Sequence, residues 1–176
     1  MAAGPQNEIY LDIETLRLSD EVEGGWGSIH KFGLAVAVTW DPENRFRRWF
    51  EPDVTPLIAE LQQWSRIITF NGDRFDLTVL QGYGPVGELR KRSLDLLTDL
   101  KSKLGYRIKL DSLARETLGR FKSGSGLDAV RWWRAGDKAK VCEYCGNDVQ
   151  LLIDLVEHAR KKGYVVVDGR RLPIHW

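Results

Sequence analysis

Three strand-like runs in succession, followed by a helix and a further strand, limit the possible folds of this chain more than any other feature of its sequence. The runs cover residues 8–14, 30–40 and 45–50, which are rich in apolar, aromatic and β-branched side chains. A turn of sequence DPEN at 41–44 separates the second run from the third, which predicts an antiparallel hairpin. An amphipathic helix is expected next, over residues 55–65.

This helix leads into a short buried strand, predicted over residues 66–70. Thr55 is expected to cap the helix, with Pro56 at its first helical position. The order of elements predicts an α/β fold with a mixed sheet flanked by helices. The first three strands are expected to be antiparallel, and the sheet then continues through parallel crossovers.

The rest of the chain is predicted to be helical up to a terminal hairpin. Helices are expected from about Asp76, over 94–103, over 110–118 with Gly119 as C-cap, after a Gly-Ser-Gly break at 124–126, and from an Asp137 cap to about Lys162. An Asp-Gly pair between β-favouring runs predicts a hairpin at about 164–174. The length suits one domain, so residues 1–176 are interpreted as a single domain.

Composition excludes several classes of protein. The chain is 43% hydrophobic and 29% charged, which is typical of a soluble globular protein and argues against disorder. No apolar stretch has membrane-spanning length, the start does not resemble a signal peptide, and two cysteines do not make a disulfide framework. We therefore expect a cytoplasmic, reduced location without a membrane partner. The net charge of +1 means that contact with nucleic acid requires a local basic patch.

Four carboxylates and a tyrosine occupy positions from which they can share one pocket. Asp12 and Glu14 lie two apart in a predicted strand, so they face the same side. Tyr144 and Asp148 lie four apart in a predicted helix and also share a face. Asp76 follows a strand end and a turn, where α/β proteins usually place ligand-binding groups.

Such a cluster would repel itself and take up protons unless cations neutralised it. Oxygen ligands without histidine or cysteine favour Mg²⁺ or Mn²⁺ over zinc. Two such ions, roughly 3.5–4 Å apart, can activate a water and stabilise the leaving oxygen in phosphodiester hydrolysis. A tyrosine hydroxyl near that water would orient it. The pattern therefore predicts a two-metal nuclease.

Coincidence is the alternative explanation, because the chain has 25 acidic residues and most such residues are solvated. A second Y-x-x-x-D occurs at Tyr164 and Asp168, but Asp168 opens the Asp-Gly turn of the terminal hairpin. Coincidence explains Asp12 and Glu14 less well, since two acids within an apolar strand are costly unless paired or metal-bound.

Two further features have competing interpretations. Cys142 and Cys145 form a C-x-x-C inside a helical pattern, which favours small apolar residues over a zinc or redox site. A basic segment over 120–140 includes Arg131, Lys138 and two tryptophans. It is either a binding surface for single strands, as positively charged grooves with aromatic side chains are, or a solvated helix face with a tryptophan in the core.

At its acidic motifs the chain resembles the DEDD superfamily of 3′–5′ exonucleases, which have a ribonuclease H-like fold. The matching segments are Asp12-x-Glu14, Asn71-x-x-x-Phe75-Asp76 and Tyr144-x-x-x-Asp148. The second is similar to proofreading domains of family B DNA polymerases, and the surrounding sequence resembles stand-alone bacterial-type exonuclease domains. The histidine subtype would need a histidine where Glu143 stands, so the chain resembles the tyrosine subtype.

The resemblance implies a role for each motif residue. Asp12 would bridge two metal ions, Glu14 would help to hold the catalytic ion and its water, and Asp148 would ligate the catalytic ion. Asp76 would act on the second ion, mainly through waters.

Two neighbours of Asp76 have an implied role and an ordinary alternative. Phe75 would pack near the terminal nucleotide, or it is simply a core residue. Asn71 would hydrogen-bond substrate or brace the turn, or it belongs to an ordinary Asn-Gly turn.

The function implied is a metal-dependent 3′–5′ exonuclease that acts on single-stranded 3′ ends, with DNA favoured over RNA. Two alternatives stay open. One is a catalytically silent nucleic-acid-binding or scaffold domain, which would have no chemical need for all five motif residues. The other is a ribonuclease H-like endonuclease, a class that usually lacks the tyrosine of the third motif.

Overall fold

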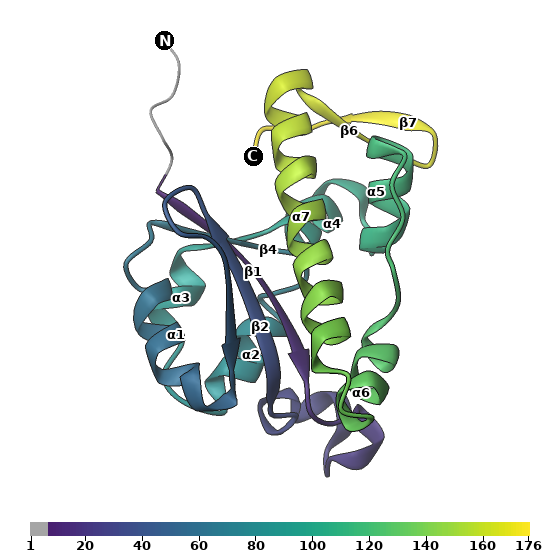
Figure 1. Cartoon of the computed structure of the whole chain (residues 1–176). Helices are drawn as coiled ribbons and strands as arrows, with labels where there is room; N and C mark the ends of the chain where they lie inside the picture. The colour runs from purple at the N-terminus through teal and green to yellow at the C-terminus, as the bar shows by residue number, and fades with distance from the viewer. Residues whose placement is uncertain (1–6) are drawn as a thin grey trace.

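A five-stranded mixed sheet with helices on both faces forms the molecule (Figure 1). This computed structural model describes residues 7–176. The strand order is β3-β2-β1-β4-β5. The strands are β1 (Glu8–Thr15), β2 (Leu34–Asp41), β3 (Arg45–Phe50), β4 (Arg66–Thr69) and β5 (Ser93–Asp95). Strands β1, β2 and β3 pair antiparallel, whereas β4 and β5 add in parallel, which confirms the predicted sheet.

The helices divide between the two faces of the sheet. Those on one face are α1 (Val54–Leu61), α2 (Asp76–Gln81) and α3 (Gly87–Lys91), and those on the other are α4 (Leu96–Leu104), α5 (Leu110–Leu118), α6 (Gly126–Arg134) and α7 (Lys138–Lys162). Short 3₁₀ turns are η1 (Ser19–Glu21), η2 (Gly25–Gly27), η3 (Ile29–Lys31) and η4 (Glu51–Asp53). The predicted terminal hairpin is β6 (Tyr164–Val167) and β7 (Arg170–Pro173).

Strand β1 separates two hydrophobic cores by the alternation of its side chains. Ile9 and Ile13 are buried with α1, α2 and α3, while Tyr10 is buried on the side of α7. Because successive residues of a strand face opposite sides, Asp12 and Glu14 face α7 together with Tyr10. The alternation thus presents the first acidic motif to the helix that carries the third.

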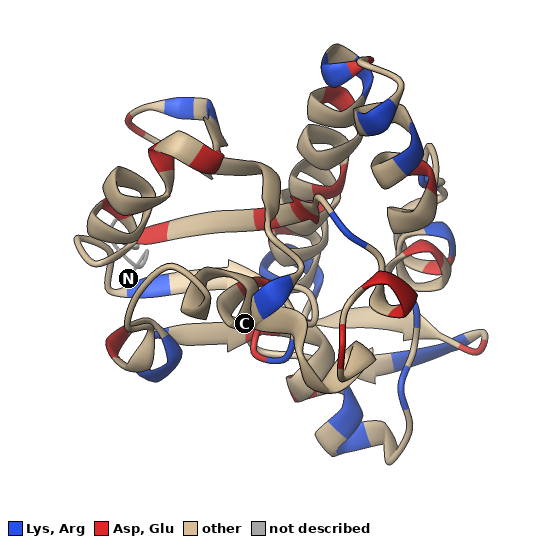
Figure 2. Cartoon of the chain, turned by 90° about the horizontal axis from the view of Figure 1, so that it is seen from below, with Lys and Arg blue, Asp and Glu red and all other residues tan. Residues whose placement is uncertain are grey.

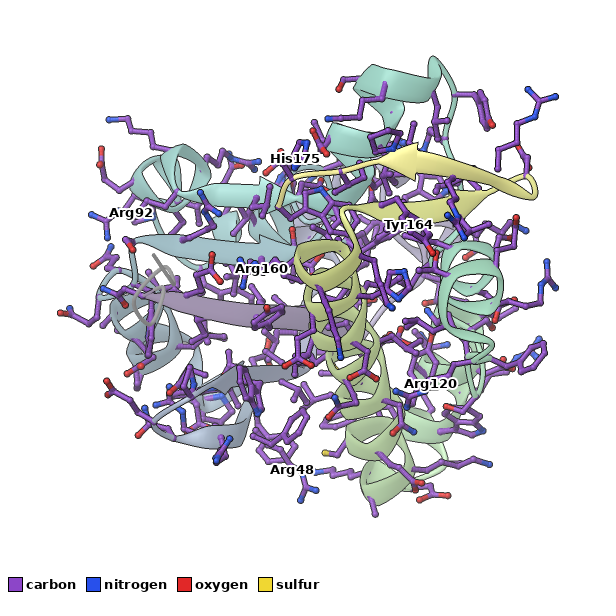
Figure 3. All side chains as sticks on the ribbon, turned by 90° about the horizontal axis from the view of Figure 1, so that it is seen from above. Arg48, Arg92, Arg120, Arg160, Tyr164 and His175 are labelled. Carbon is purple, nitrogen blue, oxygen red and sulfur yellow. The ribbon has the colours of Figure 1, made fainter. Side chains whose placement is uncertain are left out.

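Helix α7 is fixed to β1 by an ion pair far from the motifs, between a buried glutamate and an arginine at the surface. Arg160 donates from Nη2 to both carboxylate oxygens of Glu8 at 2.8 Å, and Glu8 is only 5% exposed. Figure 3 shows Arg160 on the part of α7 that leads into the hairpin. Since Glu8 begins β1 and Arg160 lies near the end of α7, this pair sets how the helix lies along the strand.

The predicted first helix differs at both ends. Helix α1 ends at Leu61, not at Ser65, and its N-cap position is Asp53, with Thr55 inside the helix. The turn η4 contains Pro52 and starts the helical path earlier. Beyond the helix, the Ser65 amide donates to the Asn7 carbonyl, just before β1, at 3.1 Å.

The predicted starts of one strand and one helix also need correction. Strand β2 begins at Leu34, not at residue 30, because η3 and a left-handed Gly33, with φ of +72°, precede it. The helix predicted over 94–103 begins at Leu96, because residues 93–95 pair in parallel with β4 as strand β5. Helix α3 was not predicted. A strand of three residues and a helix of five are too short to give a clear periodic pattern.

Charge is distributed over the whole molecule. Basic and acidic segments alternate along helices and loops in Figure 2, in agreement with the net charge of +1. Within residues 7–176, no helix combines the length and the apolar character that a membrane crossing requires. That residues 1–176 form one domain stays a prediction, and residues 1–6 lie outside the described part.

Candidate active site

Three carboxylates from β1 and α7 converge at one point. Oxygen atoms of Asp12, Glu14 and Asp148 all lie within 4.8 Å of one another. Glu14 and Asp148 are buried, and Asp12 is partly exposed. All three line a hollow beside the cluster. Asp76, buried in the first turn of α2, lines the same hollow from the other side. The four predicted acidic residues therefore surround one space.

Several of these carboxylate oxygens have unmet hydrogen-bonding capacity. Oδ2 of Asp12, Oδ1 of Asp76 and Oδ1 of Asp148 are buried and accept no hydrogen bond from any described residue. A buried carboxylate oxygen without a partner is costly, and a divalent cation removes that cost. An all-oxygen set suits Mg²⁺ or Mn²⁺, so the residues present fit such ions.

The acidic groups resist ionisation in each other's presence. Burial and the charge of Asp148 raise the pKa of Asp12 to about 7, although Lys122 opposes the shift. Burial and the neighbouring acids also raise the pKa of Glu14 and of Asp76 well above the usual range. Protons therefore compete with cations for this cluster near neutral pH.

Lys122 supplies a positive charge inside the acidic cluster. Its Nζ lies 2.5 Å from Oδ2 of Asp148 and 5.2 Å from the centroid of the Tyr144 ring. Burial lowers its pKa, but the carboxylates of Asp148 and Asp12 raise it by more. In the sequence, Lys122 is only one of the basic residues of the segment over 120–140. No local pattern distinguishes it, because its position depends on how the chain between α5 and α6 folds back over the sheet.

Tyr144 places its hydroxyl beside the cluster. It precedes Asp148 by one helical turn in α7, and its ring packs edge-on against Trp132 with centroids 5.8 Å apart. Burial and the nearby acids raise the pKa of Tyr144, so the phenol keeps its proton. A protonated, fixed hydroxyl can donate a hydrogen bond to a water or phosphate at the cluster.

The turn of the second motif is held by Asp95, an acid outside the three motifs. The carboxylate of Asp95 accepts from the Asn71 amide at 2.7 Å and from the Asp73 amide at 3.2 Å. It also caps α4 by accepting from the Leu97 amide. Asn71 has a left-handed backbone, with φ of +67°, which asparagine tolerates better than most residues. Asp95 thus fixes the turn that leads to Asp76.

Phe75 borders a hollow of about 380 Å³ at the acidic cluster. Its ring lies 6.4 Å from those of Trp26 and Phe32, so it packs in an aromatic group as well as lining the hollow. Trp26, in η2, is 59% exposed and lines the same hollow together with Leu18. In the sequence, Trp26 lies among glycines, in the segment GGWG at 24–27.

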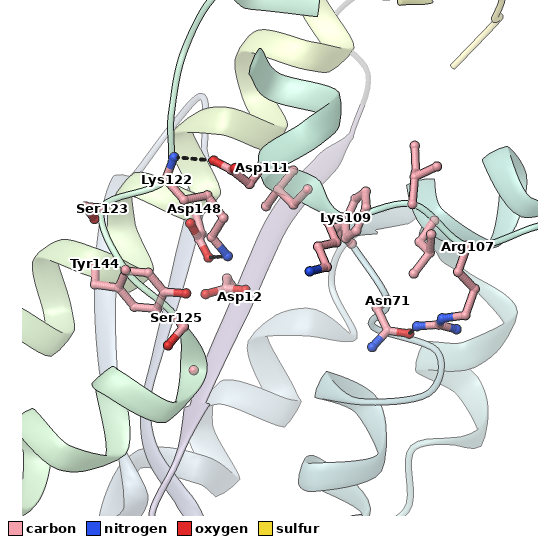
Figure 4. A pocket seen from close by; sticks show the side chains of 16 residues that line it. Asp12, Asn71, Arg107, Lys109, Asp111, Lys122, Ser123, Ser125, Tyr144 and Asp148 are labelled. Atoms are coloured by element: carbon pink, nitrogen blue, oxygen red, sulfur yellow. Dashed lines mark hydrogen bonds and ion pairs between the residues drawn. The ribbon is translucent and has the colours of Figure 1, made fainter. Parts of the chain in front are cut away.

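A larger hollow of about 1030 Å³ extends from the cluster in another direction (Figure 4). Asp12, Tyr144 and Asp148 line one end, and Asn71 and Arg107 the other. There Arg107 donates from Nη2 to the side-chain oxygen of Asn71 at 2.8 Å. Asn71 therefore both forms the turn and contributes its side chain to the hollow.

The basic segment does not act as one surface. Lys122 enters the cluster, whereas Arg131 and Lys138 line neither hollow. Arg131 lies 4.0 Å from Asp128, and Nζ of Lys138 lies 5.0 Å from the centroid of the Trp133 ring. Substrate binding by Arg131 and Lys138 stays a prediction.

The remaining sequence features have structural roles. Cys142 and Cys145 are free and buried in α7, and Cys145 donates to the backbone oxygen of Asp12 at 3.3 Å. Asp168 lies in the turn between β6 and β7 with φ of +50°, and Tyr164 packs against His158. The second Y-x-x-x-D is therefore a turn, as predicted.

A sequence model of the RNase H superfamily matches residues 9–161, from β1 to the end of α7. The chain belongs to this superfamily. Membership of the RNase H superfamily supports a nuclease function, with nucleic acid as substrate and divalent metal ions as the usual cofactors. No curated protein matches the chain by sequence.

Among solved structures, this RNase H superfamily member is similar to the family B DNA polymerase from the hyperthermophilic archaeon Pyrobaculum calidifontis, with a TM-score of 0.65. The two sequences are 12% identical, and the match covers 86% of this chain and 24% of the polymerase chain. The chain thus spans about a quarter of the polymerase's length. At this identity the likeness shows the fold.

Proposed function

We propose that the protein is a metal-dependent 3′–5′ exonuclease of the tyrosine subtype, which removes nucleotides from single-stranded ends, with DNA favoured over RNA. One observation carries the proposal: Asp12, Glu14 and Asp148 bring carboxylate oxygens within 4.8 Å of one another, beside the Tyr144 hydroxyl. A scaffold domain has no need to bury like charges so close together.

The acidic residues would hold two Mg²⁺ or Mn²⁺ ions. Asp12 would contribute to both sites, Glu14 and Asp148 to the catalytic one, and Asp76 to the second. Ions bound there would activate an attacking water and stabilise the leaving oxygen of the phosphodiester. Tyr144 would orient that water through its hydroxyl.

The smaller hollow would receive the terminal nucleotide. Trp26 and Phe75 offer aromatic surface for its base, and bases stack on aromatic side chains without regard to sequence. Lys122 pairs with Asp148 when no substrate is bound. With substrate present, it would contact the scissile phosphate and offset its negative charge. The tyrosine distinguishes this proposal from a ribonuclease H-like endonuclease.

Isosteric loss of one ligand tests the proposal. Asp12→Asn and Asp148→Asn should each abolish Mg²⁺- or Mn²⁺-dependent degradation of a single-stranded oligonucleotide, with circular dichroism unchanged from wild type. Activity close to wild type in either variant would remove the metal assignment.

The direction and mode of attack need separate substrates. Time courses on 5′-labelled and 3′-labelled DNA and RNA strands should show release from the 3′ end, faster on DNA. A closed circular single strand should stay intact. Cleavage of the circle would favour the endonuclease alternative, and binding without any cleavage would favour a silent domain.

A further inference from the structure

The larger hollow changes in charge along its length. Asp12, Asp111 and Asp148 lie at one end together with Lys122. Two basic side chains, Lys109 and Arg107, project into the rest. Figure 4 shows Lys109 pointing into the space between Asp12 and the pair formed by Asn71 and Arg107. A polyanion that reaches a metal centre needs such cations along its approach, because its own charge is repelled by the acids.

These two cations are available to a ligand. No ion pair joins Lys109 to any described residue, and Arg107 makes only a neutral hydrogen bond, to Asn71. Both side chains are exposed. The guanidinium of Arg107 has five N–H donors, so it can keep Asn71 and still contact a phosphate.

Apolar side chains complete the hollow. Phe70 and Ile108, both partly exposed, line it together with Leu97. Cations beside apolar and aromatic surface suit the alternating phosphates and bases of a single strand. The hollow's volume of about 1030 Å³ is nearly three times that of the smaller hollow, which is about 380 Å³.

We propose that this larger hollow binds the nucleotides that precede the terminal one, and that Lys109 and Arg107 contact their phosphates. The inference rests on the proposed exonuclease function and adds the path of the strand to it. The strand leaves the metal centre past the start of α5 and over Asn71. It does not run along α6, where Arg131 lies beside Asp128 and Lys138 covers Trp133.

The test measures what additional nucleotides contribute to substrate recognition. In the wild-type protein, KM for oligo-dT should fall at least tenfold between the dinucleotide and the hexanucleotide. In the double variant Arg107→Ala, Lys109→Ala this fall should shrink to less than threefold. For this double variant, the slope of log KM against log salt concentration should be smaller than for wild type by about 1.4. Two phosphate contacts are lost, and each contact to a single strand contributes about 0.7.

Two double variants remove the same charge elsewhere. Lys161→Ala, Lys162→Ala, at the exposed end of α7, should keep the wild-type length dependence. Arg131→Ala, Lys138→Ala tests the path along α6. If that variant loses the length dependence while the Arg107, Lys109 variant keeps it, the proposal is overturned.

A binding measurement separates this proposal from the exonuclease proposal. Fluorescence anisotropy of a labelled hexanucleotide with Ca²⁺ in place of Mg²⁺ reports binding without requiring cleavage. The Arg107, Lys109 variant should bind at least tenfold more weakly than wild type. Equal affinity overturns the proposed path even if the protein is an exonuclease, whereas a tenfold loss supports the path even if no cleavage is found.

Discussion

The side chains of the acidic cluster and its neighbours differ in whether local sequence spacing is enough to recognise them. Asp12, Glu14 and Tyr144 could be selected from spacing, because a strand and a helix each place residues at fixed intervals on one face. Lys122 could not, since it reaches Asp148 from a non-helical segment 26 residues earlier. Sequence spacing therefore predicts residues that share an element, and misses those that reach the site from irregular segments.

Tyr144 allows a test of water orientation that leaves metal binding intact. Tyr144→Phe keeps the ring that packs against Trp132 and beneath Lys122, and removes only the hydroxyl. We expect kcat on a single-stranded oligonucleotide to fall about 10²-fold. Affinity for Mn²⁺, measured by calorimetry, should stay within twofold of wild type. An unchanged kcat would contradict the assigned role.

Substitutions of Trp26 test whether the smaller hollow binds the terminal nucleotide. Its indole is largely exposed, meets Phe32 edge-on and meets Phe75 at a tilt, so its removal should cost little stability. Because a stacked base contributes about 1–3 kcal/mol, Trp26→Ala should raise KM about tenfold. Trp26→Phe keeps a stacking surface and should raise KM less. Equal effects of the two changes in steady-state kinetics would exclude stacking.

At the scale of elements, the existence of the longer strands and helices was predicted, and the two shortest elements of the main fold, β5 and α3, were missed. Residues 45–50 and 110–118 have the predicted bounds, because their periodicity extends over several residues. Strand β5 was missed: three residues become a strand only when β4 offers hydrogen bonds beside them. The same strand carries Asp95, which joins the second motif to α4.

Asp95 provides a prediction about how elements are joined. Asp95→Ala removes a buried acceptor shared by the Asn71 turn and the first turn of α4. We expect the free energy of unfolding to fall by about 3 kcal/mol, as measured by urea denaturation. Glu88→Ala, which removes an exposed acid from α3, should leave the urea midpoint close to wild type. Similar urea midpoints for wild type, Asp95→Ala and Glu88→Ala would show that Asp95 does not brace the turn.

At the scale of the whole molecule, the acidic cluster couples stability to pH and to metal. The pKa of Asp12 is about 7 in the folded protein, well above the ordinary value for aspartate of about 3.9, and Glu14 shifts in the same direction. Between these pH values the folded state holds protons that the unfolded state has lost. Stability of the metal-free protein should therefore decline as pH rises from about 4 to 7.

Thermal unfolding in EDTA and in Mg²⁺ checks this expectation. The melting temperature in EDTA should fall between pH 5 and pH 8, and the increase caused by Mg²⁺ should grow over the same interval, because protons no longer compete. The double variant Asp12→Asn, Glu14→Gln should lose most of both effects. An Mg²⁺ effect of the same size at pH 5 and pH 8 would contradict the coupling.

The sequence by itself determined the longer strands and helices, the mixed sheet and the acidic motifs, because these depend on periodicity and spacing within short segments. Only the tertiary structure decided that carboxylate oxygens of Asp12, Glu14 and Asp148 meet within 4.8 Å, and that Lys122 pairs with Asp148 there. It also decided that Lys109 and Arg107 line the larger hollow at a distance from the acidic residues at its other end. Such arrangements depend on contacts between residues far apart in the chain, which no local pattern encodes.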